Sequence, residues 1–170
     1  ITAQLKAFAR KTSPAQLGHV TMERAIDNAR QLIAGRLRDE QVAFEADVAP
    51  GLAAWCDATR LEQVLVNLFV NALDAMAGRA ERGIAVSAQR VDDRVLVRVA
   101  DTGPGIDPTV RERLFEPFFT TKPVGEGMGL GLVISQHIVH EFGGALRCGE
   151  SPRGAMFEFD LPLERRSEFA

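Results

Sequence analysis

The chain has 170 residues, of which 46% are hydrophobic and 25% are charged, and its formal net charge is −3. This composition is that of an ordinary folded domain, so it excludes wholesale disorder and disfavours two full domains. The mildly acidic charge offers no broad basic surface, which argues against nucleic acid as a partner, and no apolar run approaches the roughly 20 residues of a membrane-spanning helix. Ile1 stands where an initiator methionine would be, so we expect a piece of a longer protein.

The first part of the chain predicts two helices and two strand-like stretches. Residues 1 to 12 carry one short apolar stripe at helical spacing, which indicates the end of a truncated helix. After the break at Ser13-Pro14, apolar side chains at three- and four-residue steps predict a second helix from Pro14 to about residue 37. Alternation over residues 42 to 46 predicts a strand, and a Pro-Gly turn leads to a short apolar stretch at residues 52 to 56.

The clearest helix of the sequence comes next, followed by a pair of strands. Asp57 is a suitable N-cap for a helix over residues 57 to 78, in which apolar side chains recur at three- and four-residue steps. Alternating apolar residues over 84 to 88 and 95 to 99, separated by two aspartates, predict an antiparallel pair with a tight turn. The second of these strands ends on Asp101.

The stretch from residue 102 to 131 is crowded with glycine and proline and has only a brief helical patch at 110 to 114. Loops of this length are usually functional. Beyond it we expect a helix from 130 to 142 and two strands, at 145 to 148 and 156 to 163. The mixture of helices and hairpins predicts an α/β two-layer sandwich in which helices cover one face of a mixed sheet.

Two asparagines lie on the predicted central helix. Asn67 and Asn71 are four residues apart and therefore share a helical face, which has to meet polar surroundings. A side-chain amide oxygen is a suitable ligand for Mg²⁺, which retains several waters and binds phosphates as well. The spacing is equally compatible with ordinary hydrogen bonds within the fold.

An acidic residue and two glycines mark the end of the strand at 95 to 99. The carboxylate of Asp101 can accept a hydrogen bond from an exocyclic amine such as that of adenine, while Gly103 and Gly105 let a planar base approach the backbone. The alternative is an acidic turn, because Asp, Gly and Pro are the commonest turn residues.

Glycine occupies every second position from Gly125 to Gly131, directly before a predicted helix. Such a loop can point successive N–H groups at phosphate oxygens, and the helix dipole adds a favourable potential for the anion. The alternative, a flexible hinge, is less favoured because the glycines stop where the helix begins. The spacing fits neither the Rossmann glycine fingerprint nor a Walker A loop.

In this order and combination, the motifs resemble the N, G1, F and G2 boxes of sensor histidine kinases. The resemblance covers about residues 15 to 163, and the matching segments are Asn67-x-x-x-Asn71-Ala, Asp101-x-Gly103-x-Gly105, Phe115-Glu-Pro-Phe-Phe119 and Gly127-x-Gly129-x-Gly131. These kinases belong to the wider group of gyrase, Hsp90, histidine kinase and MutL ATP-binding domains. The resemblance implies the Bergerat fold, ATP and Mg²⁺ as cofactors, and a mobile ATP lid between the G1 and G2 boxes.

The resemblance also implies roles for single residues. Asn71 would coordinate Mg²⁺, Asp101 would bind adenine, and the glycines of the G2 box would contact the phosphates. The full set of implied cofactor-binding residues is Asn71, Asp74, Asp101, Gly103, Gly105, Ile106, Phe119, Lys122, Gly127, Met128, Gly129, Leu130, Gly131 and Leu132. Asp74 departs from the family, in which many members have a basic residue at this position, so Lys122 or Arg60 gains interest as a source of positive charge.

We expect Asn67 and Lys122 to be the catalytic residues. In hydrolysing relatives, the residue four before the magnesium-binding asparagine is a glutamate that activates water, whereas Asn67 has no basic lone pair at neutral pH. The expected activity is therefore that of a protein-histidine kinase, with Lys122 as a point charge near the γ-phosphate. The alternative is a domain of the same fold that hydrolyses or senses ATP without histidine kinase activity.

Within the family, residues 5 to 10 and 115 to 127 are similar to the dicarboxylate-transport sensor kinases. This implies that residues 1 to 12 end a dimerisation hairpin and that residues 13 to 170 form the catalytic domain. The phosphoacceptor histidine would lie on the missing hairpin, since none of the three histidines here is assigned to chemistry. The implied partners are ATP, the dimerisation domain of the same kinase in a homodimer, and a downstream response regulator. The implied location is the cytoplasmic portion of an inner-membrane sensor, attached to the membrane through its missing sensor part.

Overall fold

A five-stranded mixed sheet forms one layer of the fold in the computed structural model, which describes residues 16–122 and 129–165. Its strands follow the spatial order β2-β4-β5-β7-β6, in which β2 and β4 run parallel and every other neighbouring pair runs antiparallel. In that order the strands are Ala43–Val48, Gly83–Val91, Arg94–Asp101, Met156–Pro162 and Leu146–Gly149. The predicted hairpin of β4 and β5 and the two predicted C-terminal strands are confirmed.

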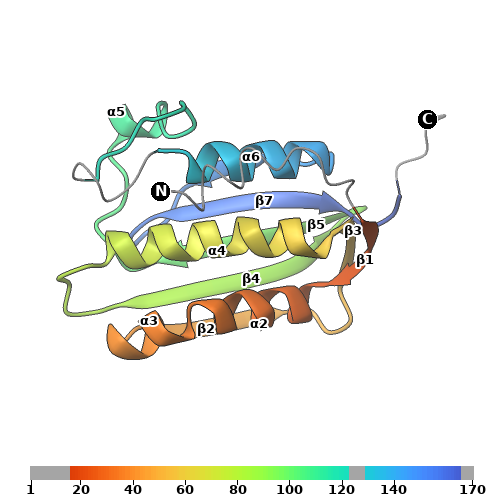
Figure 1. Cartoon of the computed structure of the whole chain (residues 1–170), viewed down its shortest axis with the longest axis horizontal. Helices are drawn as coiled ribbons and strands as arrows, with labels where there is room; N and C mark the ends of the chain where they lie inside the picture. The colour runs from red at the N-terminus through yellow and green to blue at the C-terminus, as the bar shows by residue number, and fades with distance from the viewer. Residues whose placement is uncertain (1–15, 123–128, 166–170) are drawn as a thin grey trace.

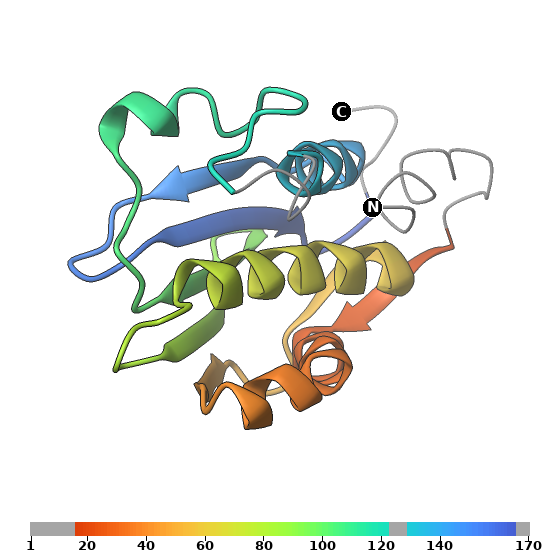
Figure 2. The ribbon, with the colours of Figure 1, turned by 60° about the vertical axis from the view of Figure 1, so that its left-hand side comes forward.

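Helices form the second layer on one face of this sheet. Figure 1 shows α2 (Met22–Leu32), α4 (Ala58–Ala75) and α6 (Gly131–Glu141) side by side, with α4 in the middle, and the turned view in Figure 2 shows the same layering. The short helix α3 (Ala34–Asp39) continues from α2, and α5 (Pro108–Arg111) lies beside the end of the layer at which α4 ends and α6 begins. The predicted two-layer sandwich is therefore confirmed.

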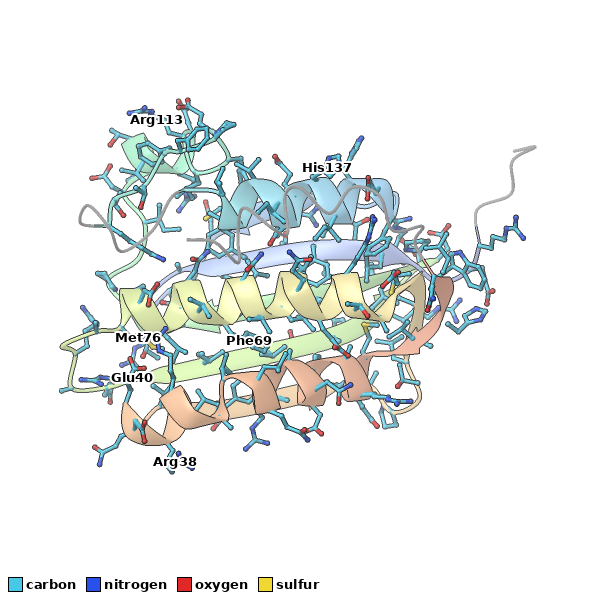
Figure 3. The ribbon with its side chains drawn as sticks, in the orientation of Figure 1. Arg38, Glu40, Phe69, Met76, Arg113 and His137 are labelled. Atoms are coloured by element: carbon cyan, nitrogen blue, oxygen red, sulfur yellow. The ribbon has the colours of Figure 1, made fainter. Side chains whose placement is uncertain are left out.

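The hydrophobic core lies between the sheet and the helices. The burial pattern of β5 shows that the end of this strand faces the helices. Burial alternates strictly along β5, so that Val95, Val97 and Val99 face the helical layer. Phe69 of α4, labelled in Figure 3, is fully buried over the sheet. Asp101 is the next position in the alternating series of β5, so a carboxyl group lies where the pattern calls for an apolar side chain.

One predicted helix is partly wrong. Residues 17–21 form a strand, β1 (Leu17–Thr21), that pairs antiparallel with β3 (Ala53–Asp57) in a second, two-stranded sheet. Gly18 and the β-branched Val20 and Thr21 weaken helix formation there, and the ladder to β3 satisfies the backbone instead. The helix itself starts only at α2 and is interrupted after Leu32.

The N-cap prediction for the central helix is confirmed. The Asp57 side chain accepts hydrogen bonds from the backbone N–H of Arg60 at 3.1 Å and from that of Gln16 at 2.7 Å. One carboxylate thus satisfies a free donor of the helix end and fixes the chain that leads into β1. Because the start of α4 is fixed in this way, the position of every side chain further along the helix is defined.

Candidate functional site

A cavity of about 590 Å³ opens between α4, the start of α6 and the ends of β5 and β7. Its volume lies within the range of small-molecule sites. One part of the lining is apolar, with Leu68, Val99, Ile106, Leu132 and Phe157. The charged and amide side chains of the lining are Arg36, Asn71, Asp74, Asp101 and Lys122, and two hydroxyl groups come from Thr120 and Thr121. Such a lining suits a ligand with a flat apolar portion and a charged portion.

Helix α4 provides one wall of the cavity through a single stripe. Leu68, Asn71, Ala72 and Ala75 recur at three- and four-residue steps and all line the cavity. Their side chains are mostly small, so the wall is open, and Asn71 is the polar group within the stripe. The structure thus places Asn71, the residue that the resemblance assigns to Mg²⁺, in the lining of the cavity.

Asp101 lies at the cavity with one oxygen fixed and the other available. Its side chain is only 7% exposed, and Oδ1 accepts hydrogen bonds from the N–H groups of Gly103 at 2.8 Å and Ala155 at 3.2 Å. In residues 16–122 and 129–165 no donor reaches Oδ2. A ligand that donates a hydrogen bond, such as an aromatic amine, would supply the partner that Oδ2 lacks.

Burial raises the pKa of the Asp101 carboxyl above its ordinary value of 3.8, although the hydrogen bonds from Gly103 and Ala155 and the charge of Arg79 act in the opposite direction. The folded state therefore holds this proton more tightly than the unfolded state does. It follows that the cost of the buried carboxylate is absent below pH 3.8 and fully present above the raised pKa.

We expect Asp101→Asn to stabilise the ligand-free protein increasingly as the pH rises from about 4 towards neutral, because asparagine never ionises. Urea unfolding of both proteins across this pH range measures the difference. Asp107→Asn is the matched control, because hydrogen bonds from Thr109 lower the pKa of the Asp107 carboxyl, so the stability that it contributes is already present above pH 3.8 and its loss should change little between about pH 4 and neutral. A difference in the free energy of unfolding between Asp101→Asn and the parent that does not change with pH would contradict the raised pKa of the Asp101 carboxyl.

Gly103 and Gly105 lie so close to neighbouring backbone and side-chain atoms that a side chain does not fit at either position without strain. A Cβ on Gly103 would lie 2.9 Å from Asp101 Oδ1 and 3.2 Å from the carbonyl oxygen of Ala75. Gly105 has a φ of +82°, and its Cβ would lie 3.3 Å from the carbonyl oxygen of Gly154. Of the two, Gly105 lines the cavity, whereas Gly103 is buried behind Asp101.

The start of α6 forms the wall opposite α4. Gly129 has a φ of +70°, and a Cβ there would collide with the backbone of Phe118 and Phe119. Gly131 begins the helix and lines the cavity, and the N-cap Leu130 is buried without a capping side chain. The first N–H groups of α6 are therefore open to an anionic group. Gly125, Gly127 and Met128, which the resemblance also assigns to phosphate binding, lie outside the described residues.

Asn67 does not line the cavity, although it shares a helical face with Asn71. Its Nδ2 donates hydrogen bonds to Ser135 Oγ at 3.1 Å and to the carbonyl oxygen of Gly131 at 3.4 Å. Asn67 therefore joins α4 to the first turns of α6. Through these two hydrogen bonds Asn67 holds the start of α6 in place, although its own side chain does not line the cavity.

A cluster of charges lies at the polar part of the cavity. Lys122 Nζ is 2.6 Å from Asp74 Oδ2 and 3.4 Å from Asn71 Oδ1. Arg36 Nη2 is 3.1 Å from the other oxygen of Asp74. Arg60, the other cation considered from the sequence, does not line the cavity but pairs with Glu141 at the opposite end of α4 and α6.

The phenylalanines of the F box occupy different surroundings. Phe115 is half-buried and packs against the core. Phe119 lines the cavity, with the Arg113 guanidinium 4.4 Å from the centre of its ring. Phe118 is 66% exposed and has a φ of +64°.

Several cavity residues carry no signal in the sequence. Arg36 reaches the cavity from α3, far from every motif. Ala155 lines the cavity directly after a turn with no unusual sequence pattern, yet its backbone makes two hydrogen bonds with Asp101. The alternation of β7 predicts that Phe157 faces inward, but not that it meets a ligand cavity.

The histidines lie away from the cavity. His19 contacts Glu164 and Trp55, and His137 lies on the outer side of α6, where Figure 3 labels it and where it pairs with Glu141. Across the described ranges, no group of three His, Cys, Asp or Glu side chains could hold a metal ion, and no helix is long and apolar enough to cross a membrane.

Sequence and structure comparisons place this site among known proteins. Residues 56–165 match the family model described as histidine kinase-, DNA gyrase B-, and HSP90-like ATPase. The C4-dicarboxylate transport sensor protein DctB of Rhizobium meliloti (strain 1021) is 40% identical over 162 residues, which are 95% of this chain and 26% of that protein. The chain thus spans about a quarter of the length of the curated relatives it matches.

Solved structures of histidine kinases are similar in fold. The catalytic domain of ThkA superposes with a TM-score of 0.78 at 30% identity, covering 86% of this chain and 95% of that one. ThkA in complex with the response regulator TrrA gives 0.79 at 26% identity, with 96% and 47% covered. Full-length ShkA in complex with AMPPNP gives 0.80 at 32% identity, with 94% and 34% covered.

These comparisons confirm the resemblance to the catalytic domains of sensor histidine kinases, including the dicarboxylate-transport group. The family match also includes the segment that carries Asn71, Asp101 and Gly131, which the cavity brings together. On this evidence the chain belongs to the histidine kinase-, DNA gyrase B- and HSP90-like ATPase family.

Proposed function

We propose that this chain is the catalytic domain of a sensor histidine kinase and transfers the γ-phosphate of ATP to a histidine on the dimerisation domain of the same kinase. The single observation that carries the proposal is the cavity itself. It combines an acid with one unsatisfied oxygen, an apolar part of the lining and a group of cations beside a helix N-terminus. Adenine, ribose and phosphates need this combination of surroundings.

The base of ATP would bind between Asp101 and the apolar lining. Asp101 Oδ2 would accept a hydrogen bond from the exocyclic amine of adenine, because its other oxygen is already engaged. Ile106, Leu132 and Phe157 provide flat apolar contacts, and the lack of a Cβ at Gly105 admits the ring. Guanine would place a carbonyl oxygen against the carboxylate, so the site should select adenine.

The phosphates would bind near the start of α6. The N–H groups after Leu130, together with Gly129 and Gly131, would receive phosphate oxygens, and Lys122 would supply a positive charge. The oxygen atoms of Asn71 and Asp74 lie around the Lys122 ammonium group, so the donor set suits a cation that prefers oxygen, and we assign Mg²⁺ to it with Asn71 as a ligand. When bound, the ion would neutralise charge on the phosphates.

Catalysis would consist mainly of positioning. The neutral imidazole of the acceptor histidine attacks the γ-phosphorus, the bond to the bridging oxygen of ADP breaks, and ADP leaves with that electron pair. Asn67 cannot act as a base towards water. Its hydrogen bonds to Gly131 and Ser135 would instead hold the start of α6, where the phosphates would bind, in position. We therefore propose that Asn67, which the sequence analysis expected to be catalytic, is instead a positioning residue, and that Lys122 is the charge beside the transferred group.

The rest of the protein would supply the other partners. We propose that residues 1–12 end the dimerisation hairpin and that residues 13–170 form the catalytic domain of a homodimer, with a response regulator downstream. Support comes from DctB, a sensor protein by name, and from the ThkA complex with its response regulator. The domain would then lie on the cytoplasmic side of the inner membrane, and the sensor part of the same protein would carry the membrane attachment.

We expect the chain to phosphorylate the dimerisation hairpin of its own kinase when the two are mixed with γ-labelled ATP and magnesium. Acid-labile, base-stable label on the hairpin measures transfer, and release of free phosphate measures hydrolysis. A hairpin with its acceptor histidine replaced is the control. Phosphate release without labelled hairpin would indicate a hydrolysing domain, and ATP binding with neither product an ATP sensor; both results would contradict the proposal.

A further inference from the structure

We propose that Asp74 faces the magnesium ion through the ion's water shell and that Lys122 occupies the place of this ion until the metal-bound nucleotide arrives. The inference rests on the proposed function, since it concerns the same cavity. It gives a role to Asp74, an acidic residue of the cavity lining that lies one turn after Asn71 on α4.

The evidence is the position of one cation. The Lys122 ammonium group lies within reach of two oxygen atoms from neighbouring turns of α4, Asp74 Oδ2 at 2.6 Å and Asn71 Oδ1 at 3.4 Å. All three side chains are half-buried. The fold therefore already contains a cation-binding position, and Asn71, the expected magnesium ligand, is one side of it.

The chemistry of the carboxylate favours an indirect contact for Asp74. Magnesium binds oxygen at about 2.1 Å and keeps several of its waters in protein sites. Asp74 Oδ2 and Asn71 Oδ1 lie 2.6 Å and 3.4 Å from the ammonium nitrogen, so both oxygens already face one cation position. A carboxylate is a strong acceptor for the polarised protons of metal-bound water, which assigns the indirect contact to Asp74.

Arg36 keeps Asp74 in place during the exchange. Its Nη2 is 3.1 Å from Asp74 Oδ1, and its Nε is 2.6 Å from Glu40 Oε2. The second oxygen of Asp74 therefore stays directed at the cation position after Lys122 has left it. Lys122 released in this way carries its charge to the incoming phosphates, so one exchange serves both the metal and the nucleotide.

The expected result concerns the effect of magnesium on nucleotide affinity. Calorimetry with AMPPNP, with magnesium and then with EDTA, gives the ratio of the two Kd values for the 170-residue chain. In the parent, magnesium should tighten AMPPNP binding, and Asp74→Asn should reduce this gain, the Kd in EDTA divided by the Kd in magnesium, about tenfold. Its magnesium-free affinity should be equal to or tighter than that of the parent, because Lys122 is no longer held. Glu141→Gln is the control for lost charge, since it lies at the far end of α6 beside Arg60.

Lys122→Gln gives a second and opposite test. Without the ammonium group both oxygens are open, so magnesium-free affinity should fall and the effect of magnesium should remain or increase. The chain has only three lysines, two of them before residue 16, so selectively labelled lysine side chains give few NMR signals. The Lys122 signal should move when Mg²⁺·AMPPNP is added and should already be displaced in ligand-free Asp74→Asn.

The outcomes separate this inference from the proposed function. If the parent chain binds no nucleotide, the proposed function fails. If the parent binds with a magnesium effect that Asp74→Asn leaves unchanged, or if the Lys122 signal does not respond to the metal complex, only the exchange is wrong. Thermal unfolding of each variant shows that it is folded, and Lys122→Gln decides the question should Asp74→Asn fail to fold.

Discussion

Asp101→Asn is expected to weaken ATP binding about a hundredfold, which corresponds to roughly 3 kcal/mol. The fixed oxygen of Asp101 already accepts two backbone N–H groups, so asparagine would keep its own oxygen there and direct its NH₂ into the cavity. Two donors would then face each other where adenine presents its amine. The backbone bonds are preserved, so the loss falls on binding while the fold is retained.

Calorimetry with AMPPNP measures this change, and guanine nucleotide provides a second comparison. Asp107→Asn is again the matched control, because it removes the same charge six residues further along and its carboxyl caps α5 without lining the cavity. The variant should also be the more stable protein at neutral pH, as argued above for its pKa. Binding equal to that of the parent would remove the acid from the adenine site and with it the basis of the proposed function.

The elements that were predicted correctly are those with strong local signals. The alternation of β5 over Val95, Val97 and Val99 fixes both its strand character and the inward direction of Asp101. The N-cap Asp57 likewise fixes the start of α4, which brings Asn71 to the cavity. Local pattern and family motif agree at these positions, and the cavity lining includes Asp101, Asn71 and Gly131.

The parts that could not be predicted depend on contacts between distant segments. Strand β1 forms only because β3, more than thirty residues later, offers it a partner, so helical spacing in that segment was misleading. Asn67 and Asn71 are equivalent on a helical wheel, and only the position of Ser135 on α6 separates them. Arg36 of α3 lines the cavity and pairs with Asp74 of α4, a contact between distant residues that no spacing in the sequence encodes.

The turn that supports Asp101 is the second position at which a single change should have a large effect. Gly154 has a φ of +68°, and a Cβ there would collide with the main-chain carbonyl of Asp101 and lie 2.7 Å from its Oδ1. The neighbouring Ala155 accepts a hydrogen bond from the N–H of Asp101 at 2.9 Å and donates one to its carboxylate at 3.2 Å. The backbone of this turn thus holds both the main chain and the carboxylate of Asp101.

We therefore expect Gly154→Ala to destabilise the protein by about 3 kcal/mol, since it combines a strained φ with an overpacked contact that only a backbone shift can relieve. The shift would break the bonds between Ala155 and Asp101, so ATP affinity should fall as well. Urea unfolding measures the first effect and calorimetry the second.

Gly51→Ala isolates the contribution of φ. Gly51 has nearly the same conformation, with a φ of +71°, but nothing lies within 4 Å of an added Cβ. Its substitution should cost only about 1 kcal/mol and leave ATP affinity unchanged. Equal losses of stability at the two glycines, with no loss of affinity at Gly154, would mean that the turn can move without disturbing Asp101. A larger loss of stability at Gly154, together with weaker ATP binding, would show that close backbone packing of the turn at Gly154 and Ala155 holds Asp101 in its binding position.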